Sequence, residues 1–248
     1  MNWLELRRAT PARIGLGRSG TALPTAAQLD FQLAHARARD AVYATLDSDR
    51  ILAELRAHGL KALTVRSQAA DRATYLRRPD LGRKLAAASR RLLLRHSGPR
   101  RDDESGARHV AFVIADGLSA TAVNAHAAPL MAAVLPRLDG WRVAPVAVVE
   151  QGRVAIGDEI GGLLGADLAA VLIGERPGLS AADSLGVYVT WAPAPGTVDA
   201  ARHCLSNIRP AGMPIDEAAD ALARLMAAAR QHRMTGVALS QRLVGPAG

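Results

Sequence analysis

Two carboxylates follow apolar segments that are typical of buried strands. Asp116 comes directly after HVAFVIA, and Glu175 comes two residues after LAAVLI, with Arg176 beside it. Ligands gather at the carboxyl ends of strands in open α/β sheets, so both carboxylates are binding candidates. Each also has a purely structural interpretation. Asp116 or Ser119 can cap the following helix, and Glu175 can pair with Arg176 in a solvated loop.

A second group of candidates lies elsewhere in the chain. The lone cysteine, Cys204, follows His203, but a nucleophilic thiol needs a positioned base, and a small buried thiol is the alternative. Asp158 and Glu159 follow Gly157, and we interpret them as caps of a short helix. The 7 histidines form no ligand-spaced pair with a second cysteine, so the sequence predicts no metal site and no self-sufficient catalytic set.

The glycine-rich segment GLGRSG at 15–20 matches the pattern GxGxxG. A dinucleotide site of that kind needs a buried strand before the loop and a helix N-terminus at its end. The preceding residues, RRATPARI, are not a buried strand, and Pro24 follows closely. We therefore interpret the segment as part of an irregular arm. A stand-alone nucleotide-dependent enzyme is the corresponding minor alternative.

The elements that would position these residues fall into three parts. Residues 1–24 are expected to form an irregular arm, and 25–105 a helical region. Within that region, periodicity predicts helices over 25–45 and 79–96, with a short strand near 62–66. Leu29 and Leu33 would share one helical face. The polar segment SGPRRDDESG at 97–106 is the best linker candidate.

In residues 106–248 the predicted strands and helices alternate, as in an α/β domain. Apolar runs predict strands at 109–115, 143–149, 168–173 and 187–191. Helices are expected at 119–134, 157–164 and 215–233. Strands that alternate with helices indicate a largely parallel, Rossmann-like sheet with flanking helices. The fold class is therefore α/β, preceded by an α-helical N-terminal region.

Composition limits the classes of protein to which the chain can belong. It has 248 residues, of which 49% are hydrophobic, which is typical of a globular protein. One cysteine cannot form an internal disulfide, as suits a reducing compartment. No apolar run reaches the ~18 residues of a membrane span, and the N-terminus has no apolar signal core. We expect a cytoplasmic protein with no membrane association.

The net charge of +8 is unevenly divided. Residues 1–108 carry 21 Lys and Arg against 11 Asp and Glu, a net charge of +10, whereas residues 109–248 carry 10 against 12, a net charge of −2. A basic half can contact nucleic acid, a phosphate-bearing ligand or an acidic protein partner. Few aromatic residues interleave with the arginines, which disfavours single-stranded nucleic acid. A basic nucleic-acid-binding module with an α/β accessory domain stays open as the alternative.

Several long strings, in order along the chain, resemble the small (light) chain of ethanolamine ammonia-lyase. They are LDFQLAHARARDAV, DRATYLRRPDLGRKL, ADGLSATAV, HAAPL, GDEIG, LIGERPGLS, ADSLGVYVTWAP and CLSNIRP. Together they span roughly residues 13–240, and they are far more specific than the short motifs above. The N-terminal arm is shorter than in many members of that family.

The resemblance implies a subunit of an adenosylcobalamin-dependent carbon–nitrogen lyase, which converts ethanolamine to acetaldehyde and ammonia by radical chemistry. In that family a large barrel chain holds the substrate and does the chemistry, while the small chain covers part of the cobalamin, with six of each chain. The cofactor carries the radical chemistry, and the protein positions and shields it. Neither nucleic acid nor a membrane is implied as a partner. The enzyme works in the cytoplasm or within a bacterial microcompartment.

By the same resemblance, the cobalamin contacts of this chain are Val154, Glu175 and Cys204, with no catalytic residue. The amide groups at the rim of the corrin can donate hydrogen bonds to the Glu175 carboxylate or to the backbone carbonyl of Val154. The Cys204 thiol would pack against the corrin edge. The base-off cobalamin motif D-x-H-x-x-G is absent around His126, as expected for a family that binds its cofactor base-on.

Overall fold

A computed structural model describes residues 3–10, 12–97 and 107–244. Its centre is a mixed 7-stranded sheet with the order β1-β4-β2-β5-β6-β7, in which β3 also pairs with β2. The strands are β1 (Ala62–Arg66), β2 (Arg108–Ala115), β3 (Trp141–Val143), β4 (Val146–Glu150), β5 (Leu168–Gly174), β6 (Leu185–Trp191) and β7 (Arg202–Ile208). The pairs among β1, β4, β2, β3 and β5 are parallel. Strands β6 and β7 extend the sheet in antiparallel fashion.

The largely parallel α/β fold predicted from the sequence is confirmed. Strand β2 is buried along most of its length and pairs with β3, β4 and β5. Its continuous apolar run follows from that position, because a strand covered by helices on both faces has no solvent-facing side. Strand β5 is buried throughout for the same reason.

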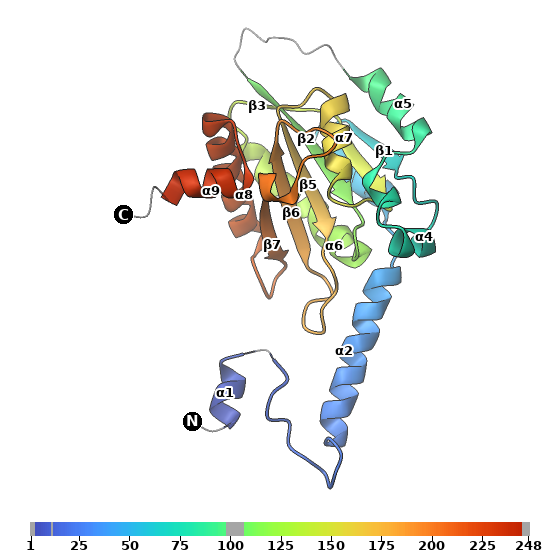
Figure 1. The fold of residues 1–248 in the computed structure, drawn as a ribbon, viewed down its shortest axis with the longest axis vertical. Helices are drawn as coiled ribbons and strands as arrows, with labels where there is room; N and C mark the ends of the chain where they lie inside the picture. Colours follow the sequence, from blue (N-terminus) through green and yellow to red (C-terminus); the bar gives the residue numbers. More distant parts are fainter. Residues whose placement is uncertain (1–2, 11, 98–106, 245–248) are drawn as a thin grey trace.

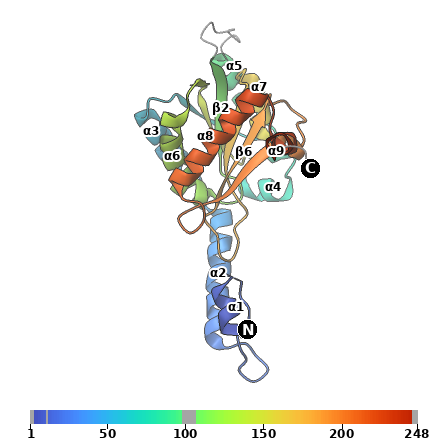
Figure 2. The same cartoon turned by 90° about the vertical axis from the view of Figure 1, so that its left-hand side faces the viewer.

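Helices cover both faces of the sheet, and the first two helices of the chain lie away from it (Figures 1 and 2). The helices are α1 (Trp3–Arg8), α2 (Thr25–Tyr43), α3 (Ser48–Ala57), α4 (Arg72–Arg77), α5 (Ala87–His96), α6 (Ala120–Val134), α7 (Ile156–Leu163), α8 (Ile215–His232) and α9 (Gly236–Val244). Along β2, Val110, Phe112 and Ile114 join the core under α3, α6 and α8. The intervening Ala111 and Val113 join a second core under α7. This alternation is the period of two that a strand imposes on its side chains.

Helix α2 projects away from the sheet in both views (Figures 1 and 2). Of its 19 residues, Ala34 and Ala41 are buried. The expected stripe with Leu29 and Leu33 exists, but these side chains are 58% and 51% exposed instead of packed. The end of α2 is held by Arg72, whose Nε donates to the Val42 carbonyl at 2.6 Å.

The single helix expected over 79–96 is wrong. A short 3-10 turn at Leu81–Arg83 is followed by extended backbone and then by α5. The chain opens there because it bonds to β1 and the residues after it: Gln68 N–H donates to the Lys84 carbonyl at 2.9 Å, and Ala86 N–H to the Arg66 carbonyl at 3.0 Å. A pairing with a distant segment thus overrides the local helical periodicity.

Some elements were not predicted from the sequence, among them α1 inside the N-terminal arm, β7 and α9. The linker candidate at 97–106 lies, apart from Ser97, outside the described residues, and the division at 105/106 stays a prediction. Strand β1, from the N-terminal side of that division, pairs with β4 over its whole length. In the parts of the chain that the structure describes, no helix combines the length and apolar character needed to cross a membrane.

Candidate functional site

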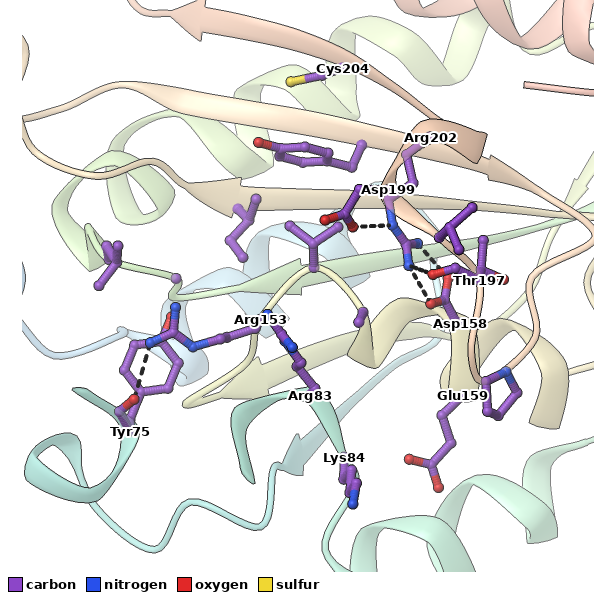
Figure 3. A pocket seen from close by; sticks show the side chains of 18 of the residues that line it. Tyr75, Arg83, Lys84, Arg153, Asp158, Glu159, Thr197, Asp199, Arg202 and Cys204 are labelled. Carbon is purple, nitrogen blue, oxygen red and sulfur yellow. Dashed lines mark hydrogen bonds and ion pairs between the residues drawn. The ribbon is translucent and has the colours of Figure 1, made fainter. Parts of the chain in front are cut away.

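A cavity of about 1380 Å³ opens beyond the carboxyl ends of β2, β4 and β5 and continues over β6 and β7 (Figure 3). Val154, Glu175 and Cys204 all line it. These residues come from three distant segments: the β4–α7 turn, the end of β5 and the middle of β7. A cavity of this size exceeds the ~300–1,000 Å³ of ordinary small-molecule pockets, so it suits a large ligand.

The floor of the cavity depends on a close approach of two strand ends. Gly117, after β2, has a φ of +57°, and a Cβ atom there would lie 2.3 Å from the Gly174 carbonyl oxygen. Leu118 N–H donates to that same carbonyl at 2.9 Å. No side chain fits between the two turns, so glycine is required at position 117.

Asp116 ties the end of β2 to the turn between β4 and α7 instead of capping a helix. Its carboxylate accepts the backbone N–H groups of Gln151 and Gly152, both at 2.9 Å. Burial raises the pKa of Asp116 to about 6, against the opposing effects of these N–H donors and of Arg72 at 3.6 Å. The helix cap is Ser119, whose hydroxyl accepts Ala122 N–H at 3.2 Å.

Tyr75 holds the loop that leads to Val154, a role that no pattern in the sequence predicts. Its ring is fully buried between two guanidinium groups, with Arg72 4.7 Å and Arg153 4.4 Å from the ring centroid. Its hydroxyl donates to the Gly152 carbonyl at 3.3 Å. Burial raises the pKa of Tyr75 to about 12, so the hydroxyl keeps its proton at neutral pH. The stack fixes the backbone next to Val154.

Val154 lines the cavity just before α7. Its carbonyl accepts Gly157 N–H at 3.0 Å, at the start of α7. A carbonyl oxygen has two lone pairs, so one remains for a ligand donor.

Glu175 is held by three donors, and none of them is Arg176. Its Oε1 accepts the Ser206 hydroxyl at 2.6 Å. Its Oε2 accepts the Ser184 hydroxyl and, at 3.2 Å, Asn207 N–H. The carboxylate therefore joins the ends of β5, β6 and β7. A carboxylate has about four acceptor sites, so one site is left for a ligand.

His203 and Cys204 lie on opposite faces of β7, because successive side chains in a strand alternate. His203 turns toward α9, where its Nδ1 accepts Gly236 N–H at 3.0 Å. Cys204 faces the cavity opposite Tyr188, and partial desolvation raises the pKa of its thiol. The imidazole cannot activate this protonated thiol, so the arrangement is suited to packing and not to nucleophilic attack.

The interpretation of Asp158 and Glu159 as helix caps is wrong, because both side chains bond to distant segments instead. They lie in the first turn of α7 without a side-chain cap hydrogen bond. Asp158 forms a two-pronged ion pair with Arg202 at 2.6 and 2.7 Å, with both side chains almost completely buried. Glu159 accepts Leu85 N–H at 2.9 Å and Arg90 at 2.8 Å. These contacts bind α7 to β7 and to the segment before α5.

The GLGRSG segment lies between α1 and α2. Gly15 packs against Trp3, where a Cβ atom would lie 2.9 Å from that of the tryptophan. A helix precedes the segment where a dinucleotide loop needs a strand, and α2 begins only at Thr25. The structural requirement for a nucleotide site is therefore unmet. Elsewhere, the described parts of the chain hold no group of three or more His, Cys, Asp or Glu arranged to bind a metal ion.

Comparison with known proteins gives one consistent result. Residues 1–240 match the family model described as ethanolamine ammonia-lyase light chain (EutC). The chain is similar to the ethanolamine ammonia-lyase small subunit of Azotobacter vinelandii, with 53% identity over 240 residues that cover 96% of this chain and 87% of the relative. The small subunit of Ralstonia nicotianae is 52% identical over 241 residues, 96% of this chain and 88% of the relative. That of Bradyrhizobium diazoefficiens is 53% identical over 239 residues, 95% and 89%.

Proposed function

Since this chain belongs to the ethanolamine ammonia-lyase light-chain family, we propose that it binds adenosylcobalamin together with a large chain and so completes the lyase. The reaction converts ethanolamine to acetaldehyde and ammonia, and the substrate site lies on the large chain. Six copies of each chain assemble, and the enzyme works in the cytoplasm or in a microcompartment. Family membership favours this function over a nucleic-acid-binding module.

One observation supports the cofactor role above all others. Val154, Glu175 and Cys204, the three contacts that the family resemblance implies, line a single large cavity. Two of them retain acceptor capacity: one lone pair at the Val154 carbonyl and one site on the Glu175 carboxylate. The corrin rim carries amide donors that fit these acceptors. Cobalamin would supply the radical by homolysis of its cobalt–carbon bond, while this chain holds and shields it.

The assembly role is supported by the N-terminal region. Helix α2 exposes Leu29, Phe31 and Leu33, together with Arg37 and Arg39. Leu29 and Leu33, four residues apart, share one face of the helix, and exposed apolar side chains that share a face mark a surface that a partner covers. We assign this helix to the contact with the large chain.

A reconstitution experiment tests the function. The purified chain is mixed with the large chain, ethanolamine and adenosylcobalamin, and acetaldehyde is measured. We expect turnover to depend on this chain, so equal acetaldehyde formation in its absence would refute the proposal.

A variant tests the cofactor role separately. Glu175→Ala is expected to weaken cobalamin binding about tenfold or more, because a ligand acceptor and three strand-end bonds are lost together. Assembly with the large chain should change less. Glu150→Ala, which removes a carboxylate paired with Arg66 outside the cavity, is the matched control. Unchanged cofactor affinity in the Glu175 variant would count against the assignment.

A further inference from the structure

The acidic side chains that line the cavity all have partners within this chain, whereas several of the basic ones do not. Of these charged side chains, six are cations and four are anions; the cations are Arg83, Lys84, Arg90, Arg153, Arg176 and Arg202, and the anions are Asp158, Glu159, Glu175 and Asp199. Every anion has a partner in this chain. Asp158 and Asp199 pair with Arg202, and Glu159 with Arg90. Glu175 accepts two hydroxyls and one N–H group.

Four of the cations, Arg83, Lys84, Arg153 and Arg176, have no carboxylate partner among the described residues, and the first two are neighbours in the chain. Arg83 and Lys84 are exposed, and among the described residues no carboxylate lies within ion-pair distance of either side chain. The carboxylate of Asp80, which feels the charge of Lys84, is itself paired with Arg78 at 2.8 Å. The cavity therefore carries positive charge at this end that no acid of the described chain neutralises.

Arg153 adds a buried donor to the same end. Its Nη2 donates to the Tyr75 carbonyl at 3.1 Å, and its guanidinium stacks on the Tyr75 ring. Its Nε is buried without any hydrogen-bond partner. A buried N–H of a charged group that lacks an acceptor is costly, and a ligand that supplies one removes that cost.

The backbone brings Arg83 and Arg153 together. Arg153 N–H donates to the carbonyl of Gly82, the neighbour of Arg83, at 2.8 Å. A Cβ atom on Gly82 would lie 3.0 Å from Cγ of Arg153 and 3.1 Å from the Tyr75 ring. The glycine thus allows the two segments to meet. Figure 3 shows Arg83 beside Arg153, whose side chain extends toward Tyr75 and away from the Asp158–Arg202 pair.

We propose that Arg83, Lys84 and Arg153 form a binding site for a phosphate group. Guanidinium groups match phosphate oxygens in geometry and charge, and a partly buried setting strengthens the interaction. The assignment rests on the proposed function. Cobalamin carries one phosphodiester, in the nucleotide tail that hangs from its corrin ring. The basic end of the cavity would hold this tail, while Val154, Glu175 and Cys204 contact the corrin.

The test compares two ligands on the complex of the full chain with its large chain. Cyanocobalamin has the nucleotide tail, and dicyanocobinamide has the corrin without the tail or its phosphate. Both affinities are measured by equilibrium dialysis with absorbance detection, which is independent of turnover. Arg83→Gln should weaken cyanocobalamin binding about tenfold and leave dicyanocobinamide binding unchanged. Arg83→Lys, which keeps the charge, should retain most of the affinity.

Arg91→Gln is the matched control, because it removes the same charge from an exposed position on α5 outside the cavity. An equal loss for both ligands, or no loss for either, would overturn the phosphate site and leave the proposed function intact. If Arg83 instead governs binding of inorganic phosphate while the two corrinoids bind equally, the site serves a separate phosphate ligand, and the assignment to the cofactor fails. Failure of the unmodified complex to bind either corrinoid would refute the proposed function itself.

Discussion

The acidic and aromatic side chains around the cavity have partners within this chain, whereas the apolar side chains of helix α2 do not. Around the cavity, the acids are paired or hydrogen-bonded, and the tyrosine ring is stacked between two arginines. On α2, Leu29, Phe31 and Leu33 are 58%, 44% and 51% exposed. The cavity is therefore organised before any partner arrives, whereas α2 has an apolar surface that folding of this chain alone does not bury. Substitutions at the buried, paired residues around the cavity should lower stability, and those on α2 should alter assembly.

The largest effect on stability is expected at the buried pair of Asp158 and Arg202. Arg202→Met leaves the Asp158 carboxylate buried without its counter-ion, which costs about 3–5 kcal/mol in the free energy of unfolding. Urea denaturation measures the loss. Arg66→Met breaks an ion pair with Glu150 in which the arginine side chain is 64% exposed, and it should cost no more than ~1 kcal/mol. Similar losses in the two variants would remove the contrast between buried and exposed charge.

Asp116 should show its role through pH. Its folded pKa of about 6 lies above the ordinary value of 3.8, so between these values the folded chain binds more protons than the unfolded chain. The stabilisation that protonated Asp116 gives is present in full below pH 3.8 and is lost as the pH rises through 6, a change of about 3 kcal/mol. Asp116→Asn does not titrate. The wild type should therefore lose stability relative to the Asp116→Asn variant as the pH rises from 4 to 7. A difference in unfolding free energy that stays constant over this range would refute the shifted pKa.

Ser119 should have a smaller effect, because it contributes neutral hydrogen bonds. Its hydroxyl accepts Ala122 N–H and donates to the Ala182 carbonyl at 2.7 Å. Ser119→Ala removes the cap of α6 and is expected to cost about 1–2 kcal/mol, measured by thermal or urea unfolding. Ser119→Asn, which can restore the cap but not the bond to Ala182, provides the comparison. If the asparagine variant is as unstable as the alanine variant, the bond to Ala182 and not the cap dominates.

The sequence predicted the parallel core well, because buried strands such as β2 and β5 have continuous apolar runs rich in β-branched residues. The prediction failed where contacts with distant segments determine the local secondary structure. The break before α5 depends on bonds from Gln68 to the Lys84 carbonyl and from Ala86 to the Arg66 carbonyl. Strand β7 alternates between exposed and partly buried positions, so its apolar signal is weak.

The candidate site shows the same division. Strand ends pointed to Asp116 and Glu175, and the family resemblance added Val154 and Cys204. The roles of Tyr75 and of the Asp158–Arg202 pair could not be predicted, because a single sequence does not show which distant residues come into contact. For this reason a helix cap was one of the two interpretations of Asp116 and the interpretation of Asp158 and Glu159, whereas each of these residues joins segments that are 35 or more residues apart.

The smallest effect on stability, together with a large effect on assembly, is expected on α2. Arg37 and Arg39 are exposed and lie outside the cavity. Replacing both with glutamate should change the unfolding free energy by no more than ~0.5 kcal/mol, since neither side chain is part of the core. The same double variant should impair association with the large chain, measured by size-exclusion chromatography of the mixture, because the sign of the charge on the contact surface is reversed. Leu29→Ser with Leu33→Ser tests the apolar part of that surface in the same way. Normal assembly of both variants would show that α2 is not the contact, whereas lost stability without lost assembly would make α2 a folding element like those around the cavity.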